Sequence, residues 1–451
     1  MLLICDVFLM LCGPCAVGRA RILCPIQVLS GRPGPFRFVR TILARGAGAC
    51  HGAAPTPAVG LGLRLGCMGD ELIEIHGTCA PGFEPVRQAF AANFAERGEI
   101  GASVAVVAGG EPVVNLWAGW ADPAMTRPWQ ENTLTNVWST TKAVTSLCAQ
   151  LLIDRGELDP DAPVARYWPQ FAQAGKGDIP VRWIMSHKSG LTGLTAPASL
   201  ADYYDWDKIT GLLAQQEPLF PPGTVSGYQA ITFGYLVGEV IRRIAGQTCG
   251  QLAAAEIAGP LGADFHLGLA EADLGRCSEL QGVRPSDDEQ AALAQAYANA
   301  HPAALAALLN PALTGDEANS PDWRKAEIPA ANGHATALGL ATILGAVADG
   351  SQRLISERTL QIACTGQGRY TDLVLGFPLE FGLGFGLSGP EHHFGPNPAA
   401  FGHDGFGGSA VGADPQAGVA FAYVMNRMGM NLADDPRKTA VVDGVFQSLA
   451  G

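Results

Sequence analysis

The sequence predicts an α+β fold in which one antiparallel sheet is flanked by terminal helices and interrupted by an inserted, mainly helical domain. Three observations lead to this fold class. A hairpin pattern occurs near residue 110, further strand patterns occur at 400–427, and the long stretch between them contains helical patterns. Because strands joined by hairpins pair antiparallel, we expect both ends of the chain to contribute to one sheet.

The first predicted elements are a helix and a hairpin. The segment GFEPVRQAFAANFAER at 82–97 has apolar residues at helical spacing. It is followed by GASVAVVAGGEPVVNLWAG at 101–119, where two strand-like runs meet at Gly109 and Gly110. Two glycines between such runs indicate a tight turn, so the second segment is expected to form two paired strands.

The later elements divide the chain into parts. Three helical patterns, YLVGEVIRRIAG, ALAALLNPAL and GLATILGAVADG, occur between residues 180 and 370. Residues 400–427 contain two strands around the turn DPQAG, and the closing segment DPRKTAVVDGVFQSLA predicts a helix. The resulting division is one domain at 68–450, with a sheet part at 82–175 and 371–450 and a helical insertion at about 176–370.

The first 67 residues differ in composition from the rest of the chain. Residues 1–69 contain seven arginines and a single acid, Asp6, whereas the remainder contains 22 basic and 41 acidic residues. Asp6 interrupts an apolar stretch that no basic residue precedes, which argues against a signal peptide, and prolines and glycines spoil the helix of a transit peptide. We expect residues 1–67 to be a disordered or non-native extension, with Met68 as the true start.

Composition also narrows the classes of function. The net charge is −13, and no basic stripe with interleaved aromatic residues follows the N-terminal segment, which argues against nucleic-acid binding. No stretch reaches the roughly 18 apolar residues of a membrane span. The five cysteines after residue 67 form no CxxC pair, which suits a reducing compartment and hence the cytoplasm. The oligomeric state is left open.

Several enzyme signatures are missing. The motif GxSxG, which marks the nucleophile of α/β-hydrolases, does not occur, and neither do HExxH or clustered zinc-ligand spacings. The pair His392-His393 lies in a segment rich in glycine and proline and is expected at the surface. We therefore expect neither a metal ion nor another cofactor.

A serine and a lysine are placed for joint chemistry in NVWSTTKAVTSLCAQLLIDRGELD, residues 136–159. Apolar residues recur at helical spacing up to Gly156, and Ser139 falls at or near the helix N-cap. Ser139 and Lys142 are three residues apart and share one helix face. A lysine takes the proton of a serine hydroxyl only when burial or a neighbouring cation lowers its pKa. An ordinary helix cap remains the alternative role for Ser139.

The same segment resembles the pattern VFSxSKxxT, and three further stretches follow it in order. They are VRWIMSHKSGL, PPGTVSGYQAITFGYLVGEVI and FGHDGFGGSAVGADPQAGVAFAYVMNRM. Together these stretches are similar to the serine β-lactamase and penicillin-binding-protein superfamily and, within it, to the class C-like esterases called family VIII carboxylesterases. The resemblance covers residues 82–450 and implies the β-lactamase/transpeptidase-like fold, which agrees with the architecture predicted above.

The resemblance implies roles for three side chains and two backbone amides. Ser139 would be the acylated nucleophile, and Lys142 would accept or relay its proton. Tyr228 would act as the general base, as a phenolate stabilised by Lys142. The backbone N–H groups of Ser139 and Phe406 would form the oxyanion hole. Without the resemblance, Tyr228 would be interpreted as a packing aromatic residue ahead of a helix.

Substrate binding is the expected role of His403 and Gly405, in the stretch that begins FGHDG, and of Trp138 beside the serine. His403 occupies the position that is lysine in most β-lactamases, and Gly405 would let its strand approach the substrate closely. Trp138, together with Trp206 and Phe406, would form a wall of the acyl or alcohol pocket. Core packing is the ordinary role of such aromatic residues, and a structural role is the alternative for His403.

Two departures from the family pattern bear on the substrate. Ala230 replaces the asparagine with which β-lactamases grip an amide side chain, and His403 weakens the fixed positive charge that would hold a carboxylate. We therefore expect a serine hydrolase that cleaves small to medium carboxylic esters through an acyl-enzyme on Ser139. An amidase, a transacylase or a weak β-lactamase on the same scaffold is the alternative, and a catalytically silent binding protein is an alternative of another class.

Overall fold

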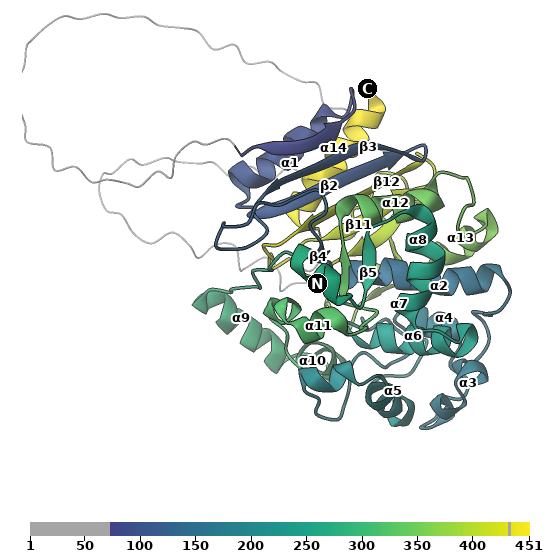
Figure 1. Cartoon of the computed structure of the whole chain (residues 1–451). Coiled ribbons are helices and arrows are strands. Elements are labelled where there is room, and N and C mark those ends of the chain that lie inside the picture. The colour runs from purple at the N-terminus through teal and green to yellow at the C-terminus, as the bar shows by residue number, and fades with distance from the viewer. Residues whose placement is uncertain (1–72, 432–433) are drawn as a thin grey trace, which may run out of the picture. The chain divides into compact units, whose positions relative to one another are not determined.

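The computed structural model describes residues 73–431 and 434–451, so the prediction for residues 1–67 lies outside the described residues. The main sheet is antiparallel and has seven strands (Figure 1). Its strands, in spatial order, are β1 (Ile75–Cys79), β3 (Glu111–Gly119), β2 (Gly101–Ala108), β12 (Val419–Met425), β11 (Ala410–Asp414), β10 (Phe401–Asp404) and β9 (Gly386–Leu387).

The two ends of the described chain meet in the middle of this sheet. Strand β12 pairs with β2 along its whole length, from Val419 opposite Ala108 to Met425 opposite Ala102. The predicted hairpin at 101–119 and the turn DPQAG between β11 and β12 are confirmed. Two strands, β1 and β9, were not predicted, because they are short and lack a clear alternating pattern. The single strand predicted before the turn is divided into β10 and β11 by residues 405–409.

Helices cover both faces of the sheet. Helices α1 (Glu84–Glu96) and α14 (Pro436–Ala450) pack together on one face, where the ring of Phe90 lies 6.5 Å from that of Tyr423. Helix α12 (Ala337–Ala348) packs on the opposite face of β2, β11 and β12 (Figure 1). Every residue of β12 is therefore buried, and each valine there contributes about 1.5–3 kcal/mol to folding.

The packing of α12 corrects the predicted domain division. Residues 176–370 were assigned to the helical insertion, yet α12 lies within that range and belongs to the sheet part by its contacts. The reason is visible in its sequence, GLATILGAVADG, which is apolar on all sides and so gave no indication of the surface it would cover. Its Gly345 lies against Val107 of β2, where a larger side chain would clash.

The remaining elements form a helical region around α2 (Thr141–Asp154), which contacts α6 and α7. The helices of this region are α3 (Val164–Tyr167), α4 (Val181–Met185), α5 (Trp206–Gln215), α6 (Thr232–Ala245), α7 (Cys249–Ala253), α8 (Gly259–Leu261), α9 (Asp287–Ala298), α10 (Pro302–Leu308), α11 (Pro321–Lys325) and α13 (Glu357–Ala363). Its strands were not predicted, because they have two or three residues each: β4 (Thr135–Asn136), β5 (Phe265–Leu267), β6 (Gly333–Ala335), β7 (Arg369–Thr371) and β8 (Pro378–Glu380).

None of the helices within 73–431 and 434–451 has both the length and the apolar character to cross a membrane.

A chain that begins at Met68 retains every described element. We therefore expect it to unfold at the same temperature as the full chain, as measured by circular dichroism at 222 nm during heating. A drop in Tm of more than about 4 °C would correspond to roughly 1 kcal/mol or more of lost stability. Such a drop would show that residues 1–67 stabilise the domain, against the prediction.

Candidate active site

Ser139 lies in a 3-10 turn, Trp138–Thr140, that leads directly into α2. The side chain of Ser139 is half-buried, whereas Trp138 and Thr140 on either side are buried. Trp138 has a φ of +46°, a conformation that costs a bulky residue about 1–3 kcal/mol. Its ring is held between those of Trp323, at 5.1 Å, and Phe406, at 5.5 Å. Because Trp138 and Thr140 are buried, Ser139 is the residue of this turn that a ligand can reach.

Lys142 is fully buried although it is charged in water. Its Nζ lies 2.9 Å from Oγ of Ser139, 2.8 Å from the carbonyl oxygen of Ala230 and 3.0 Å from that of Ala330. In the part of the chain that the structure describes, it makes no ion pair with a carboxylate. The helical spacing of Ser139 and Lys142 therefore brings the two groups into contact, as predicted.

Burial holds the pKa of Lys142 well below its usual value. A neutral amine has two N–H bonds and one lone pair, and Nζ has two hydrogen-bond acceptors and one hydroxyl around it. The carbonyl groups of Ala230 and Ala330 accept the two N–H bonds, and the lone pair remains for the proton of Ser139. The site therefore presents a base to the nucleophile without needing a third side chain to activate the lysine.

Tyr228 faces the same amine. Its ring centroid lies 4.9 Å from Nζ of Lys142, and its backbone N–H donates to Oδ1 of Asp372 at 3.1 Å. Burial raises the pKa of Tyr228, although contact with the Ser139 hydroxyl opposes this effect. Burial thus favours a neutral phenol over the phenolate that the resemblance implies. Tyr228 is placed to donate a proton, and Lys142 is placed to accept one.

His403 is buried on β10 and its ring lies 6.2 Å from that of Tyr228. Its Nδ1 is 2.7 Å from the carbonyl oxygen of Asp404, a contact that requires the proton on Nδ1. Within the described residues Nε2 has no partner, so it offers a lone pair. Burial holds the pKa of His403 well below its ordinary value, and a proton on Lys142 would lower it further. The position is thus uncharged.

The loop that joins β10 to β11 carries Phe406 next to the nucleophile turn. A Cβ atom on Gly405 would lie 2.5 Å from the carbonyl oxygen of Val137 and 2.8 Å from Oγ1 of Thr140, so only glycine allows this approach. In the described part of the chain, the backbone N–H groups of Ser139 and Phe406 have no protein acceptor. Both amides are therefore available to a ligand, which is what the predicted oxyanion hole requires.

Three placements differ from the predictions. Trp138 is 3% exposed and packs in the core, so it does not line an open pocket. Gly405 lies against the nucleophile turn and is close to protein atoms where substrate contact was expected. His392 was expected at the surface, but it is buried, with Nδ1 3.8 Å from Oδ2 of Asp404.

Sequence reasoning missed the residues that hold Tyr228 and the oxyanion loop. His187 packs 4.7 Å from the Tyr228 ring, and its Nδ1 accepts the backbone N–H of Gln229. Asp372 accepts hydrogen bonds from the Tyr228 amide and from the Ser226 hydroxyl. His187 lies in one of the matched stretches and could have been noticed. Asp372 comes from a segment 144 residues away, and no local pattern indicates it.

Two further observations concern metal binding and the position of a cavity. Within residues 73–431 and 434–451, no three His, Cys, Asp or Glu side chains are grouped so that they could hold a metal ion. A cavity of about 480 Å³ is lined by Arg97, Met428 and Arg437 among other residues, but not by Ser139 or Lys142. This cavity is therefore separate from Ser139 and Lys142.

Comparisons with known proteins agree over most of the chain. A family model described as Beta-lactamase matches residues 86–446. Esterase/beta-lactamase LipL of Mycobacterium tuberculosis (strain ATCC 25618 / H37Rv) is 38% identical over 376 residues, which cover 78% of this chain and 83% of LipL. The crystal structure of a family VIII carboxylesterase has a TM-score of 0.78 and 40% identity, covering 83% of this chain and 100% of that one. A penicillin-binding protein homolog from Caulobacter crescentus has a TM-score of 0.75 and 39% identity, with coverage of 83% and 100%.

Proposed function

The chain belongs to the beta-lactamase family, and on that premise we propose that it is a serine carboxylesterase acting through an acyl-enzyme on Ser139. The observation that carries the proposal is the contact, at 2.9 Å, between Oγ of Ser139 and Nζ of a buried Lys142, whose pKa is lowered by burial. The family and fold class predicted from the sequence are confirmed. The roles of individual residues are our proposal, derived below from the geometry.

Acylation begins when Oγ of Ser139 attacks the ester carbonyl carbon. The amine of Lys142 takes the hydroxyl proton as the new C–O bond forms, and the carbonyl oxygen becomes negatively charged. The N–H groups of Ser139 and Phe406 donate to that oxygen. When the tetrahedral intermediate collapses, Tyr228 donates its phenolic proton to the leaving alkoxide, and the ammonium of Lys142 returns a proton to Tyr228.

Deacylation repeats the same steps with water. Lys142 is neutral again after the alcohol leaves, so it can take a proton from a water molecule that attacks the acyl carbon. The bond between the acyl group and Ser139 then breaks, and Oγ regains its proton from Lys142 or Tyr228. Each proton taken in one half of the cycle is returned in the other.

Charge at the site supports esters as the substrate class. His403 is neutral, so the position that carries lysine in most β-lactamases offers no cation to a substrate carboxylate. Ala230 has no side-chain amide with which to bind the amide group of a substrate, and its backbone carbonyl accepts a hydrogen bond from Lys142. We infer that uncharged esters of small to medium size are preferred. Five free cysteines in the described part of the chain support a cytoplasmic location.

The proposal is tested by a panel of p-nitrophenyl esters with acyl chains of graded length, together with nitrocefin as a β-lactam. We expect hydrolysis of the esters, with one preferred chain length, and little or no turnover of nitrocefin. A fluorophosphonate probe should label the protein. Absence of both labelling and ester hydrolysis would favour a silent binding protein, and faster turnover of nitrocefin than of every ester would overturn the substrate class.

The lowered pKa of Lys142 gives a pH prediction. Only the neutral amine accepts the proton of Ser139, so kcat/KM should rise with pH as Lys142 loses its proton. Because burial lowers that pKa, the rise should be complete well below pH 10.5, the ordinary value for lysine. Initial rates with an uncharged ester between pH 5 and 10 check this. An activity that is still rising at pH 10 would show that Lys142 is charged in the resting enzyme.

A further inference from the structure

The oxyanion loop, Gly405–Ser409, needs anchors outside itself. Gly407 and Gly408 follow Phe406 and have φ values of +93° and +121°, in the region that glycine readily adopts. Two successive glycines leave the backbone many alternative conformations, so they do not by themselves fix the direction of the Phe406 amide. The precision that an oxyanion hole requires must therefore come from contacts with the surrounding protein.

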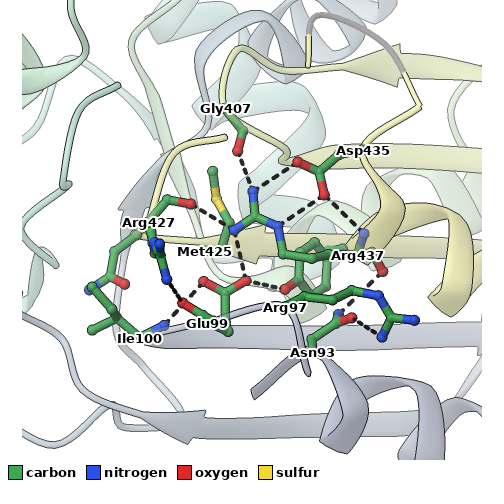
Figure 2. A network of polar contacts seen from close by, with 12 residues as sticks. Asn93, Arg97, Glu99, Ile100, Gly407, Met425, Arg427, Asp435 and Arg437 are labelled. Atoms are coloured by element: carbon green, nitrogen blue, oxygen red, sulfur yellow. Dashed lines mark hydrogen bonds and ion pairs between the residues drawn. The ribbon is translucent and has the colours of Figure 1, made fainter. Parts of the chain in front are cut away.

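One buried guanidinium provides such a contact (Figure 2). Arg437, in the first turn of α14, uses all five of its N–H bonds. Nε and Nη2 donate to the two carboxylate oxygens of Asp435, at 2.9 and 2.8 Å. Nη1 donates to Glu99 and to the carbonyl oxygen of Arg427, at 3.1 and 2.7 Å. The remaining N–H of Nη2 donates to the carbonyl oxygen of Gly407, at 2.7 Å.

The Gly407 carbonyl is thereby held from two directions. Besides the bond from Arg437, it accepts the backbone N–H of Gly429 at 2.9 Å. The fit is tight, because a Cβ atom on Gly408 would lie 2.6 Å from Nη2 of Arg437. Glu99 is itself fixed by a hydrogen bond from Tyr423 of β12, so the guanidinium is tied to the central strand of the sheet.

The opposite end of the loop is tied to the nucleophile turn. Oγ of Ser409 donates to the carbonyl oxygen of Val137 at 2.8 Å and lies 3.1 Å from Oγ1 of Thr140. The backbone N–H of Gly405 donates to the carbonyl oxygen of Ser409 at 2.6 Å. One side of the loop is thus fixed to the segment that carries Ser139, and Arg437 fixes the other side.

We propose that Arg437 is a positioning residue of the oxyanion hole, which aims the Phe406 amide by holding the carbonyl group of Gly407. This inference rests on the proposed esterase function, since it concerns the loop that would bind the developing oxyanion. In this role Arg437 contacts the loop and not the substrate. Its effect on catalysis passes through the backbone of the loop, and it should therefore act on the transition state more than on substrate binding.

The substitution Arg437→Lys keeps a positive charge but removes two of the five N–H donors and the planar shape that reaches Gly407 and Asp435 together. Loss of one oxyanion-hole donor typically costs about 10²–10³-fold in kcat, so a misaimed donor should cost roughly 10–100-fold. We expect this loss in kcat with an ester substrate, while KM changes little. An arylboronic acid, which forms a tetrahedral adduct with Ser139, should bind less tightly by a similar factor.

Glu99→Gln serves as the matched control. It removes a charged partner of the same guanidinium but leaves the bonds from Arg437 to Asp435 and Gly407 in place. We expect both variants to lower Tm, but Glu99→Gln should lower kcat much less than Arg437→Lys. Equal losses of kcat in the two variants, or a loss confined to KM, would mean that Arg437 only stabilises the fold and would overturn the proposal.

Should Arg437→Lys not fold, Asp435→Asn takes its place, because it retains the guanidinium and weakens the two bonds that orient it. A lower kcat with unchanged KM and weaker boronate binding is again expected, and an unchanged kcat would overturn the proposal. The wild-type protein separates this test from that of the function. If it neither hydrolyses esters nor reacts with a fluorophosphonate, the proposed function fails. If it does both and the variants keep their kcat, only the role of Arg437 fails.

Discussion

Ser139→Ala should reduce the turnover of a p-nitrophenyl ester by a factor on the order of 10⁴ or more. The expected loss is this large because the acyl-enzyme cannot form without the hydroxyl, and no neighbouring side chain can replace it. The measurement is the initial rate of p-nitrophenol release at saturating substrate. The fold should be unchanged, because Ser139 is half-buried and the turn keeps its backbone contacts.

Ser146→Ala is a suitable control on the same helix. Its hydroxyl is also buried, but it donates to the carbonyl oxygen of Gly384 and does not contact Lys142. Loss of this hydrogen bond should cost about 1 kcal/mol of stability and leave most of the turnover. Near-wild-type turnover by Ser139→Ala, with a normal circular dichroism spectrum, would disprove the assignment of the nucleophile.

Lys142→Arg should lose about 10²-fold or more of kcat, although arginine is also a long basic side chain. A guanidinium does not give up a proton at any pH that a protein tolerates, so it cannot serve as the base. Tyr228→Phe should cost a comparable factor because the leaving alkoxide loses its proton donor. The double variant should be barely worse than either single one, since Lys142 and Tyr228 act together in one proton relay. Steady-state rates of the three variants test this coupling.

Lys176→Arg controls for the cost of placing a guanidinium in a buried lysine site. Nζ of Lys176 is also buried and donates to backbone carbonyl groups, those of Gln173, Ala214 and Gln216, but it has no serine hydroxyl beside it. Lys176→Arg should therefore affect Tm and leave kcat nearly intact. Should Lys142→Arg behave in the same way, Lys142 would be a structural residue and the mechanism would be wrong.

The parts of the fold that the sequence predicts well are those with a strong local pattern. The hairpin β2–β3 and helix α6 have clear alternating or helical periodicity and were found where expected. Strand β1 was missed because its partner, β3, lies elsewhere in the chain. The break between β10 and β11 was missed because the segment is rich in glycine. The placement of α12 on the sheet was missed for a related reason, since a helix that is apolar all round can pack against any surface.

The candidate site shows the same division. The i, i+3 spacing predicted the contact between Ser139 and Lys142, because helix geometry alone brings the side chains together. The charge states were not predictable, since they depend on burial that only the tertiary structure defines, and burial favours the neutral form of Tyr228 over the expected phenolate. Contacts made by Asp372 and Arg437 with distant loops have no local signature, so sequence patterns could not indicate them.

The most direct test of the acyl-enzyme is mass spectrometry of the wild-type protein during turnover of a slowly hydrolysed ester. The reaction is quenched in acid, which stops deacylation, and the protein is digested and its peptides are fragmented. We predict a mass increase equal to the acyl group on the peptide that contains Ser139, located on that residue and absent from Ser139→Ala. An acyl group on any other serine, or steady ester hydrolysis with no acylated peptide at all, would contradict the mechanism.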